Sequence, residues 1–146
     1  MPDLMETYLE NREMILPNHS NNLETAHGGV VLRMMDNVGA MSAMRFAGER
    51  CVTAHMDGVN FKRPIPVGEI AVVEAYVYRA GRTSVRVRTK VHREAPRTAE
   101  RTLTTESYMV FVAIDDDREP TPVPELTVSS EASERLREEA LAGESG

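Results

Sequence analysis

The sequence is poor in cysteine, aromatic residues and long apolar runs, and each shortage excludes a class of protein. Its one cysteine, Cys51, has no second cysteine with which to form an internal disulfide or a cysteine-based zinc site. Residues 30–46 form the longest apolar segment, but charged residues interrupt it and it is shorter than the roughly 20 residues that cross a bilayer. The first ten residues do not resemble a secretory signal. We therefore expect a cytoplasmic protein with no membrane partner.

Basic residues are in the minority. The 146 residues include 17 basic and 23 acidic side chains, which give a formal net charge of -6. A protein that binds nucleic acid through its phosphates concentrates lysine and arginine on one face. We therefore expect no nucleic-acid partner. A chain of this length suits one domain with one core.

The middle of the chain predicts one long helix followed by strands. Residues 28–46 are apolar on nearly every side of a helix, which predicts a buried helix, and Gly48 offers a left-handed end for it. Strands without intervening helices favour an antiparallel sheet, so the predicted class is α+β with the helix packed on that sheet. The predicted strands, rich in β-branched residues and separated by proline and glycine, are 51–62, 69–79, 83–92 and 101–114.

The two ends of the chain are assigned more simply. Residues 8–15 predict either an edge strand or a short amphipathic segment. Residues 129–141 predict a terminal helix capped by Ser129 or Ser130, and the chain from residue 143 onward is expected to fray. We assign residues 1–128 to a single domain and residues 129–146 to the C-terminal helix and tail.

One predicted strand, residues 83–92, alternates valine or threonine with basic residues. This pattern predicts one face in the core and one face in solvent. The basic face could also neutralise ligand phosphates, together with Arg82 and Arg63. Its members are Arg86, Arg88, Lys90 and His92.

Asp36 is a carboxylate in the most apolar segment of the chain, where an unpaired charge is costly. An ion pair with Arg33, one helical turn earlier, would explain it. A general base or nucleophile in a partly dry cleft, where burial raises a carboxyl pKa, is the other explanation, and contact with Arg33 would not exclude it. The spacing alone leaves both interpretations open.

Gly28 and Gly29 lie where the predicted helix begins. Unpaired backbone N–H groups at such an end can polarise a carbonyl, although the pair could also be ordinary loop glycines. Asp36 follows about eight residues later, roughly 12 Å along the axis, so one helix cannot place both groups at one carbonyl. If the groups act together, a second copy supplies the carboxylate, which predicts a symmetric dimer with two sites.

Other chemistries find little support. The four histidines have no metal-binding spacing, and the sequence contains neither a serine-hydrolase elbow nor a glycine-rich phosphate loop. We therefore expect no metal and no cofactor.

Short motifs occur along the chain in a recognisable order. They are Asn21, His27-Gly28-Gly29, Met35-Asp36, Cys51-Val52-Thr53, Val59-Asn60-Phe61, Pro64, Val67-Gly68-Glu69, Gly81-Arg82-Thr83-Ser84 and Phe111-Val112-Ala113. The ordered set resembles the hotdog-fold acyl-CoA thioesterases, in particular bacterial and archaeal acyl-CoA hydrolases related to the brain and brown-fat enzymes. The resemblance implies a five-stranded antiparallel sheet wrapped around one long central helix, dimers that commonly assemble into hexamers, and acyl-CoA as substrate.

The resemblance also implies roles for individual residues. Asp36 activates water or attacks the thioester, Asn21 of the facing subunit orients water or the carbonyl, and the Gly29 N–H polarises the carbonyl. One departure is Glu24, at a loop position where such relatives often have glycine. The substrate-binding positions that the resemblance implies are His27, Gly28, Arg63, Gly81, Arg82, Thr83 and Ser84, with Arg82 as a phosphate partner.

Two other functions remain to be weighed. A non-catalytic acyl-CoA binder or sensor could use the same fold. A hotdog hydratase would need a histidine about one helical turn from its aspartate, and no histidine follows Asp36 in the predicted helix. Acyl-CoA hydrolysis at a dimer interface is therefore the leading hypothesis.

Overall fold

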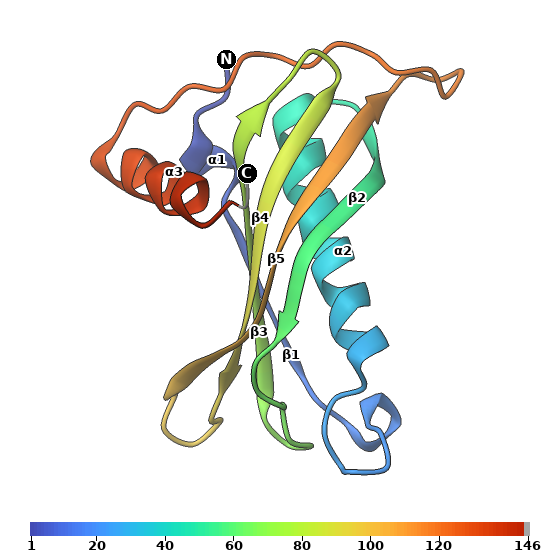
Figure 1. Ribbon diagram of the computed structural model, residues 1–146, viewed down its shortest axis with the longest axis vertical. Coiled ribbons are helices and arrows are strands. Elements are labelled where there is room, and N and C mark those ends of the chain that lie inside the picture. The colour runs from blue at the N-terminus through green and yellow to red at the C-terminus, as the bar shows by residue number, and fades with distance from the viewer. Residues whose placement is uncertain (145–146) are drawn as a thin grey trace.

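The computed structural model describes residues 1–144 of the chain. Its five strands form one antiparallel sheet in the order β1-β3-β4-β5-β2, which curves around helix α2 (Figure 1). The strands are β1 (Leu9–Met14), β2 (Arg50–Phe61), β3 (Ile70–Ala80), β4 (Ser84–Glu94) and β5 (Arg101–Ile114). The α+β class and the sheet around one long helix are confirmed. Of the two interpretations of residues 8–15, the edge strand is correct.

Helix α2 (Gly28–Ala47) ends close to the residues that the sequence indicated. Gly48 adopts φ 69° as its C-cap, the left-handed conformation that glycine adopts without strain. The buried face packs on the concave side of the sheet, and at Gly39 an added Cβ would lie only 3.2 Å from Met109 Sδ and the Phe111 ring. This glycine therefore lets the helix approach β5 closely.

The prediction that this helix is buried on every side is wrong for the single chain. Arg33, Asn37, Met41 and Met44 face outward, and Met41 is 44% exposed. The sheet has only one concave face, so it can cover only one side of the helix. Strand β2, at the edge of the sheet, is also largely exposed, including Val52.

Helix α3 (Glu131–Gly143) covers the other face of the sheet. Ser130 caps it by accepting a hydrogen bond from the Ser133 N–H, as expected. The hydroxyl of Tyr76 donates to the Leu136 carbonyl (3.0 Å), and that of Tyr108 donates to the Ala140 carbonyl (2.8 Å). Side chains on the convex face of the sheet thus hold the helix at two successive turns.

The expected solvent-exposed basic face of β4 and the expected fraying from residue 143 both need correction. Arg88 is 5% exposed and pairs with Glu106, while Lys90 pairs with Glu139 of α3. Glu144 accepts from Arg79 and Arg86, so the chain is held as far as this residue. The rest of the expected tail, residues 145–146, lies outside the described residues.

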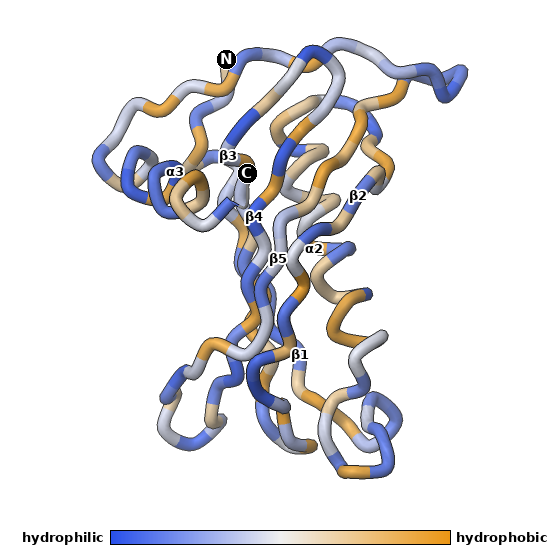
Figure 2. The backbone as a smooth tube through the Cα atoms, in the orientation of Figure 1, coloured by the Kyte–Doolittle hydropathy of each residue, from blue (hydrophilic) through white to orange (hydrophobic). Residues whose placement is uncertain are grey.

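Figure 2 shows the alternation of hydrophobic and hydrophilic residues along the strands. This pattern does not reveal whether a helix covers the polar face of the sheet.

The remaining helices are short. Helix α1 (Leu4–Thr7) precedes β1, and the 3-10 helix η1 (Pro17–His19) begins the loop that leads to α2. No helix in residues 1–144 combines the length and apolarity that a membrane span needs.

Candidate active site

Asp36 is held by the neighbouring edge strand. The Thr53 hydroxyl on β2 donates a hydrogen bond to Asp36 Oδ1 at 2.5 Å. A register irregularity between Thr53 and His55 interrupts the regular pairing of β2 with β5 at this point. The proposed Arg33 ion pair is not observed among the described residues, so that interpretation of Asp36 is wrong. The structure instead presents a half-buried carboxylate oriented by a hydroxyl.

A shallow hollow of about 400 Å³ lies beside this hydrogen bond. Asp36 and Gly29 both line it, but they are separated by about seven helical residues, roughly 10 Å along the axis. That a second chain supplies one of the two groups stays a prediction. The lining residues are Gly29, Leu32, Arg33, Asp36, Thr53 and Met56.

The N-terminus of α2 differs from its prediction. Gly29 was expected to present an open N–H group, yet this group donates to Nδ1 of His27 at 3.0 Å. His27 is the N-cap residue, with an extended backbone at φ -64° and ψ 135°, and its side chain folds back over the first turn. The side chain of the N-cap residue therefore occupies this amide.

Gly28 faces a second hollow, of about 320 Å³, at the same end of the helix. Val31, Ile65 and Phe61 also line this hollow, and the Phe61 ring lies 3.7 Å from where a Cβ on Gly28 would be. Arg63 also lines the hollow and donates to the Leu103 carbonyl at 3.0 Å. Gly28 and Arg63 are thus brought together, with apolar surface between the helix and the end of β2.

Asn21 lies in the loop before α2 and lines neither hollow. Its Oδ1 accepts from the Leu23 N–H (2.9 Å), the Thr25 N–H (3.2 Å) and the Thr25 hydroxyl (3.2 Å). The carbonyl oxygen of the side chain therefore shapes its own loop, and the amide NH2 is the group that can donate to a carbonyl or to water.

Glu24 in the same loop adopts φ 60°, a left-handed conformation that favours glycine. The backbone geometry at this position thus suits the glycine that the resemblance led us to expect there. The loop keeps its shape, since the Val67 N–H donates to the Glu24 carbonyl at 3.0 Å.

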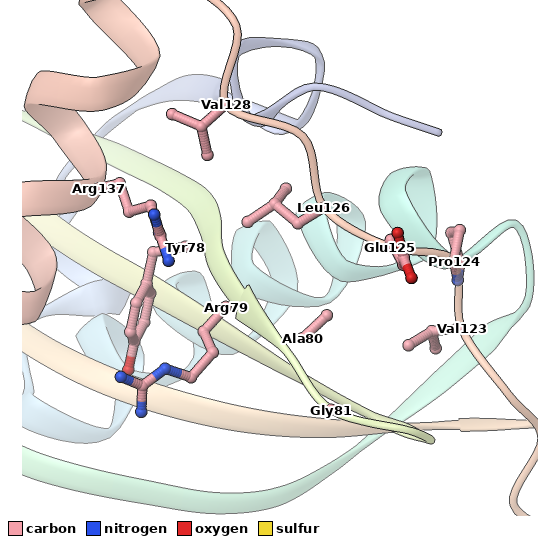
Figure 3. Close-up of a pocket in the computed structure, with 10 residues that line it drawn as sticks. All are labelled: Tyr78, Arg79, Ala80, Gly81, Val123, Pro124, Glu125, Leu126, Val128 and Arg137. Carbon is pink, nitrogen blue, oxygen red and sulfur yellow. The ribbon is translucent and has the colours of Figure 1, made fainter.

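The turn from Gly81 to Ser84 lies near the end of α2, away from Gly28 and Gly29 at its beginning (Figure 1). Gly81 lines a third hollow, of about 450 Å³, between β3, residues 123–128 and α3. Figure 3 shows Arg79 and Arg137 beside the Tyr78 ring, across this hollow from Pro124. None of the residues of the turn, 81–84, lines the hollow beside Asp36. A single subunit therefore does not join this turn to the candidate site. Arg82 and Thr83 belong to the same turn, where the Arg82 carbonyl accepts from Val123 and the Thr83 carbonyl accepts from Ala113.

Two alternative chemistries are poorly supported by the described residues. Burial, with a smaller contribution from Glu49, raises the pKa of the Cys51 thiol to about 11, so it is protonated at neutral pH and a poor nucleophile. Residues 1–144 contain no group of three histidine, cysteine or acidic side chains placed to hold a metal.

Thr53 is the functional candidate that reasoning from the sequence missed. It stands in the Cys51-Val52-Thr53 motif, which contributed to the resemblance but was given no role. A hydroxyl on an edge strand has many structural uses, so only its contact with Asp36 distinguishes it.

Comparison with known proteins adds independent findings. A family model described as the thioesterase superfamily matches residues 23–100, more than half of the chain. An uncharacterized acyl-CoA thioester hydrolase of Bacillus subtilis, YkhA, is 33% identical over 93% of this chain and 79% of its own.

Solved structures match the whole fold. An apo hexameric acyl-CoA thioesterase superposes with a TM-score of 0.88 and 38% identity, covering 97% of this chain and 92% of that one. An acyl-CoA hydrolase from Staphylococcus aureus, in complex with butyryl-CoA, CoA and CoA disulfide, has a TM-score of 0.88 and 28% identity, covering 96% and 85%. Variants of the latter protein carry alanine in place of an asparagine, an aspartate or a threonine.

Proposed function

The chain belongs to the thioesterase superfamily, and from that premise we propose that it hydrolyses acyl-CoA to a free acid and CoA. The fold is the hotdog fold that its motifs implied. The single observation that carries the proposal is the pairing of Thr53 with Asp36 beside an open hollow. A carboxylate oriented in this way can act on water or on a thioester carbon.

The reaction uses groups that the chain itself supplies. Thr53 holds Oδ1 of Asp36, so Oδ2 is the oxygen placed to act. As general base, it takes a proton from water while the water oxygen bonds to the thioester carbon. The carbon–sulfur bond then breaks and the CoA thiolate leaves with that proton. As nucleophile, Oδ2 itself bonds to the carbon, the carbon–sulfur bond breaks and the CoA thiolate leaves. Water then hydrolyses the resulting anhydride to the free acid and the Asp36 carboxyl, which passes its proton to the thiolate.

A second copy of the chain completes this site in our proposal. The outward face of α2 and the edge strand β2 are exposed in the single chain and lie beside Asp36. A symmetric dimer through these surfaces would bring the Gly29 amide and Asn21 of one subunit towards Asp36 of the other. A hexamer, a trimer of such dimers, follows the assembly of the solved hexameric thioesterase.

The remaining assignments form part of the same proposal. Gly28 and Arg63 line the hollow at the beginning of α2, where the substrate would enter, and His27 caps this end of the helix. The turn from Gly81 to Ser84, with Arg82, would reach CoA only across a subunit boundary, because it lies away from Gly29 within one chain. We place the protein in the cytoplasm, where acyl-CoA is made and used.

Carboxylate catalysis of this kind asks for no metal and no organic cofactor. Activity should therefore survive prolonged dialysis against a chelator, with kcat measured before and after. Loss of activity that zinc or magnesium restores would contradict this part of the proposal.

The decisive experiment replaces the acid and keeps its shape. Asp36→Asn should lower kcat by about 10²-fold or more, because an amide neither accepts the proton nor attacks. Asp117→Asn, in the exposed turn after β5, is the matched control. CoA release is measured with a thiol reagent on short, medium and long acyl-CoAs, alongside melting curves.

The outcomes of this experiment are distinct. Full turnover by a folded Asp36→Asn variant would remove Asp36 from the mechanism. If the unchanged protein binds acyl-CoA but releases no CoA, it is a binder or sensor instead of an enzyme.

A further inference from the structure

The His27 ring occupies the amide that the proposed mechanism needs. Nδ1 accepts from the Gly29 N–H at 3.0 Å, and a Cβ built on Gly29 would lie only 3.2 Å from Nδ1 and 3.3 Å from Cε1. The ring therefore covers both the N–H group and the space above the α carbon. A substrate carbonyl cannot reach this donor while the ring stays in place.

The ring can leave without disturbing the backbone that carries it. The His27 N–H donates to the His19 carbonyl at 2.8 Å, and the His27 carbonyl accepts from the Val30 N–H at 2.9 Å. These two bonds fix the main chain on both sides, whereas the side chain is exposed. Exposed side chains change rotamer within nanoseconds. Displacing the ring thus costs little more than its hydrogen bond to Gly29.

Histidine is an unusual choice for this position. Helices are mostly capped by serine, threonine, aspartate or asparagine, whose short side chains stay close to the first turn. A histidine ring provides the same acceptor on a larger group that covers the neighbouring glycine. Stability alone would be served by the more common residues.

We infer that His27 is a positioning residue whose ring competes with the thioester carbonyl for the Gly29 N–H group. This inference rests on the proposed function, because it gives Gly29 the role of donor to the substrate. The ring holds the amide until the carbonyl displaces it. The ring is displaced in the substrate complex and in the transition state alike, so the energy of displacing it is the same for both. The competition therefore raises KM and leaves kcat alone.

Two substitutions separate competition from capping. His27→Ala removes the acceptor, whereas His27→Asn keeps an acceptor of the kind that caps helices. A neutral hydrogen bond of ordinary net strength predicts that KM of His27→Ala lies roughly 2- to 10-fold below that of His27→Asn. The two kcat values should agree. A KM for His27→Ala equal to or above that of His27→Asn would overturn the inference.

Calorimetry with two unreactive ligands tests the same competition without turnover. In a 2-oxoalkyl-CoA, a methylene separates sulfur from the carbonyl, so the molecule keeps the carbonyl but is not a thioester. An alkyl-CoA thioether of equal length lacks the carbonyl. The ketone should bind His27→Ala roughly 2- to 10-fold more tightly than His27→Asn, while the thioether should bind both variants equally. If neither or both ligands distinguish the variants, His27 does not compete for the Gly29 amide.

Failure of this inference and failure of the proposed function can be told apart. If Asp36→Asn abolishes CoA release but both CoA ligands bind the His27 variants equally, the hydrolase stands and only the role of His27 falls. If Asp36→Asn retains full activity while the ketone alone distinguishes the variants, the mechanism falls and the competition at Gly29 stands.

Discussion

The Thr53 hydroxyl donates to Asp36 Oδ1 across 2.5 Å, joining the edge strand β2 to the middle of helix α2. Neither residue is fully buried in the single chain, so the bond lies at a surface where a ligand or a second subunit can approach. It fixes one oxygen of the carboxylate and thereby directs the other.

Thr53→Val should impair catalysis and spare the fold. The change removes the hydroxyl but keeps the branched shape, and a hydrogen bond to a charged group contributes about 1.5–3 kcal/mol. We expect kcat to fall roughly 10- to 100-fold if this energy is lost from the transition state. The melting temperature should change little, because Thr53 is exposed and water can take the place of its hydroxyl in the resting protein. Thr53→Ser keeps the hydroxyl and should stay much closer to the unchanged protein. Equal losses in the two variants would mean that shape, and not the hydrogen bond, matters.

Glu24→Gly should stabilise the protein. Glu24 adopts φ 60°, where a side chain costs about 1–2 kcal/mol, although glycine also gains freedom in the unfolded chain. We expect the free energy of unfolding to rise by about 0.5–1 kcal/mol, measured by urea denaturation. Glu24→Ala keeps the left-handed strain and should show no such gain. A glycine variant no more stable than the alanine variant would contradict this account.

Asp3 should contribute a part of stability that is lost in acid. Its side chain accepts from the Ser133 hydroxyl (2.6 Å) and from the Ser129 N–H and hydroxyl, and these bonds lower its pKa from 3.8 to about 2. A carboxyl with a lowered folded-state pKa stabilises the fold above its unfolded pKa. This contribution is lost as the pH falls from about 4 towards 2.

Asp3→Asn removes that titration and should flatten the stability profile. Between pH 4 and 2, the free energy of unfolding should fall less steeply in this variant than in the unchanged protein, as urea denaturation at a series of pH values would show. Asp117→Asn is the control and should follow the unchanged profile. Parallel slopes for Asp3→Asn and the unchanged protein would rule out Asp3 as the titrating group.

Arg88→Met should destabilise the fold strongly. The guanidinium is buried, pairs with Glu106 and lies 4.2 Å above the Tyr108 ring, so its removal leaves Glu106 with Lys62 alone. Breaking a buried pair costs about 3–5 kcal/mol, which chemical denaturation can measure. Burial by itself would raise the pKa of Glu106, but the bonds from Lys62 and Arg88 outweigh it and lower this pKa.

Two companion variants test the cause of that loss. Arg88→Met combined with Glu106→Gln should recover part of the stability, because no unpaired charge remains. Arg86→Met removes a more exposed arginine, 3.4 Å from Glu144, and should cost less than about 1 kcal/mol. If the two single arginine variants lose equal stability, burial of Arg88 is not the cause.

The sequence by itself determined the elements of this protein. Apolar periodicity, Gly48 after the helix and Ser130 before the last one are local signals, and each boundary they predicted lies close to the observed one. Asp36 also stood out from the sequence, because a carboxylate in an apolar segment is unusual whatever surrounds it.

Only the tertiary structure decided which groups meet. Thr53 reaches Asp36 across 17 residues of separation and beside a strand irregularity, and helix α3 covers a basic face that alternation alone assigned to solvent. The His27 ring over Gly29 depends on a side-chain rotation that no residue pattern specifies. Local periodicity reports which face is apolar, whereas partners are chosen by chain packing in three dimensions.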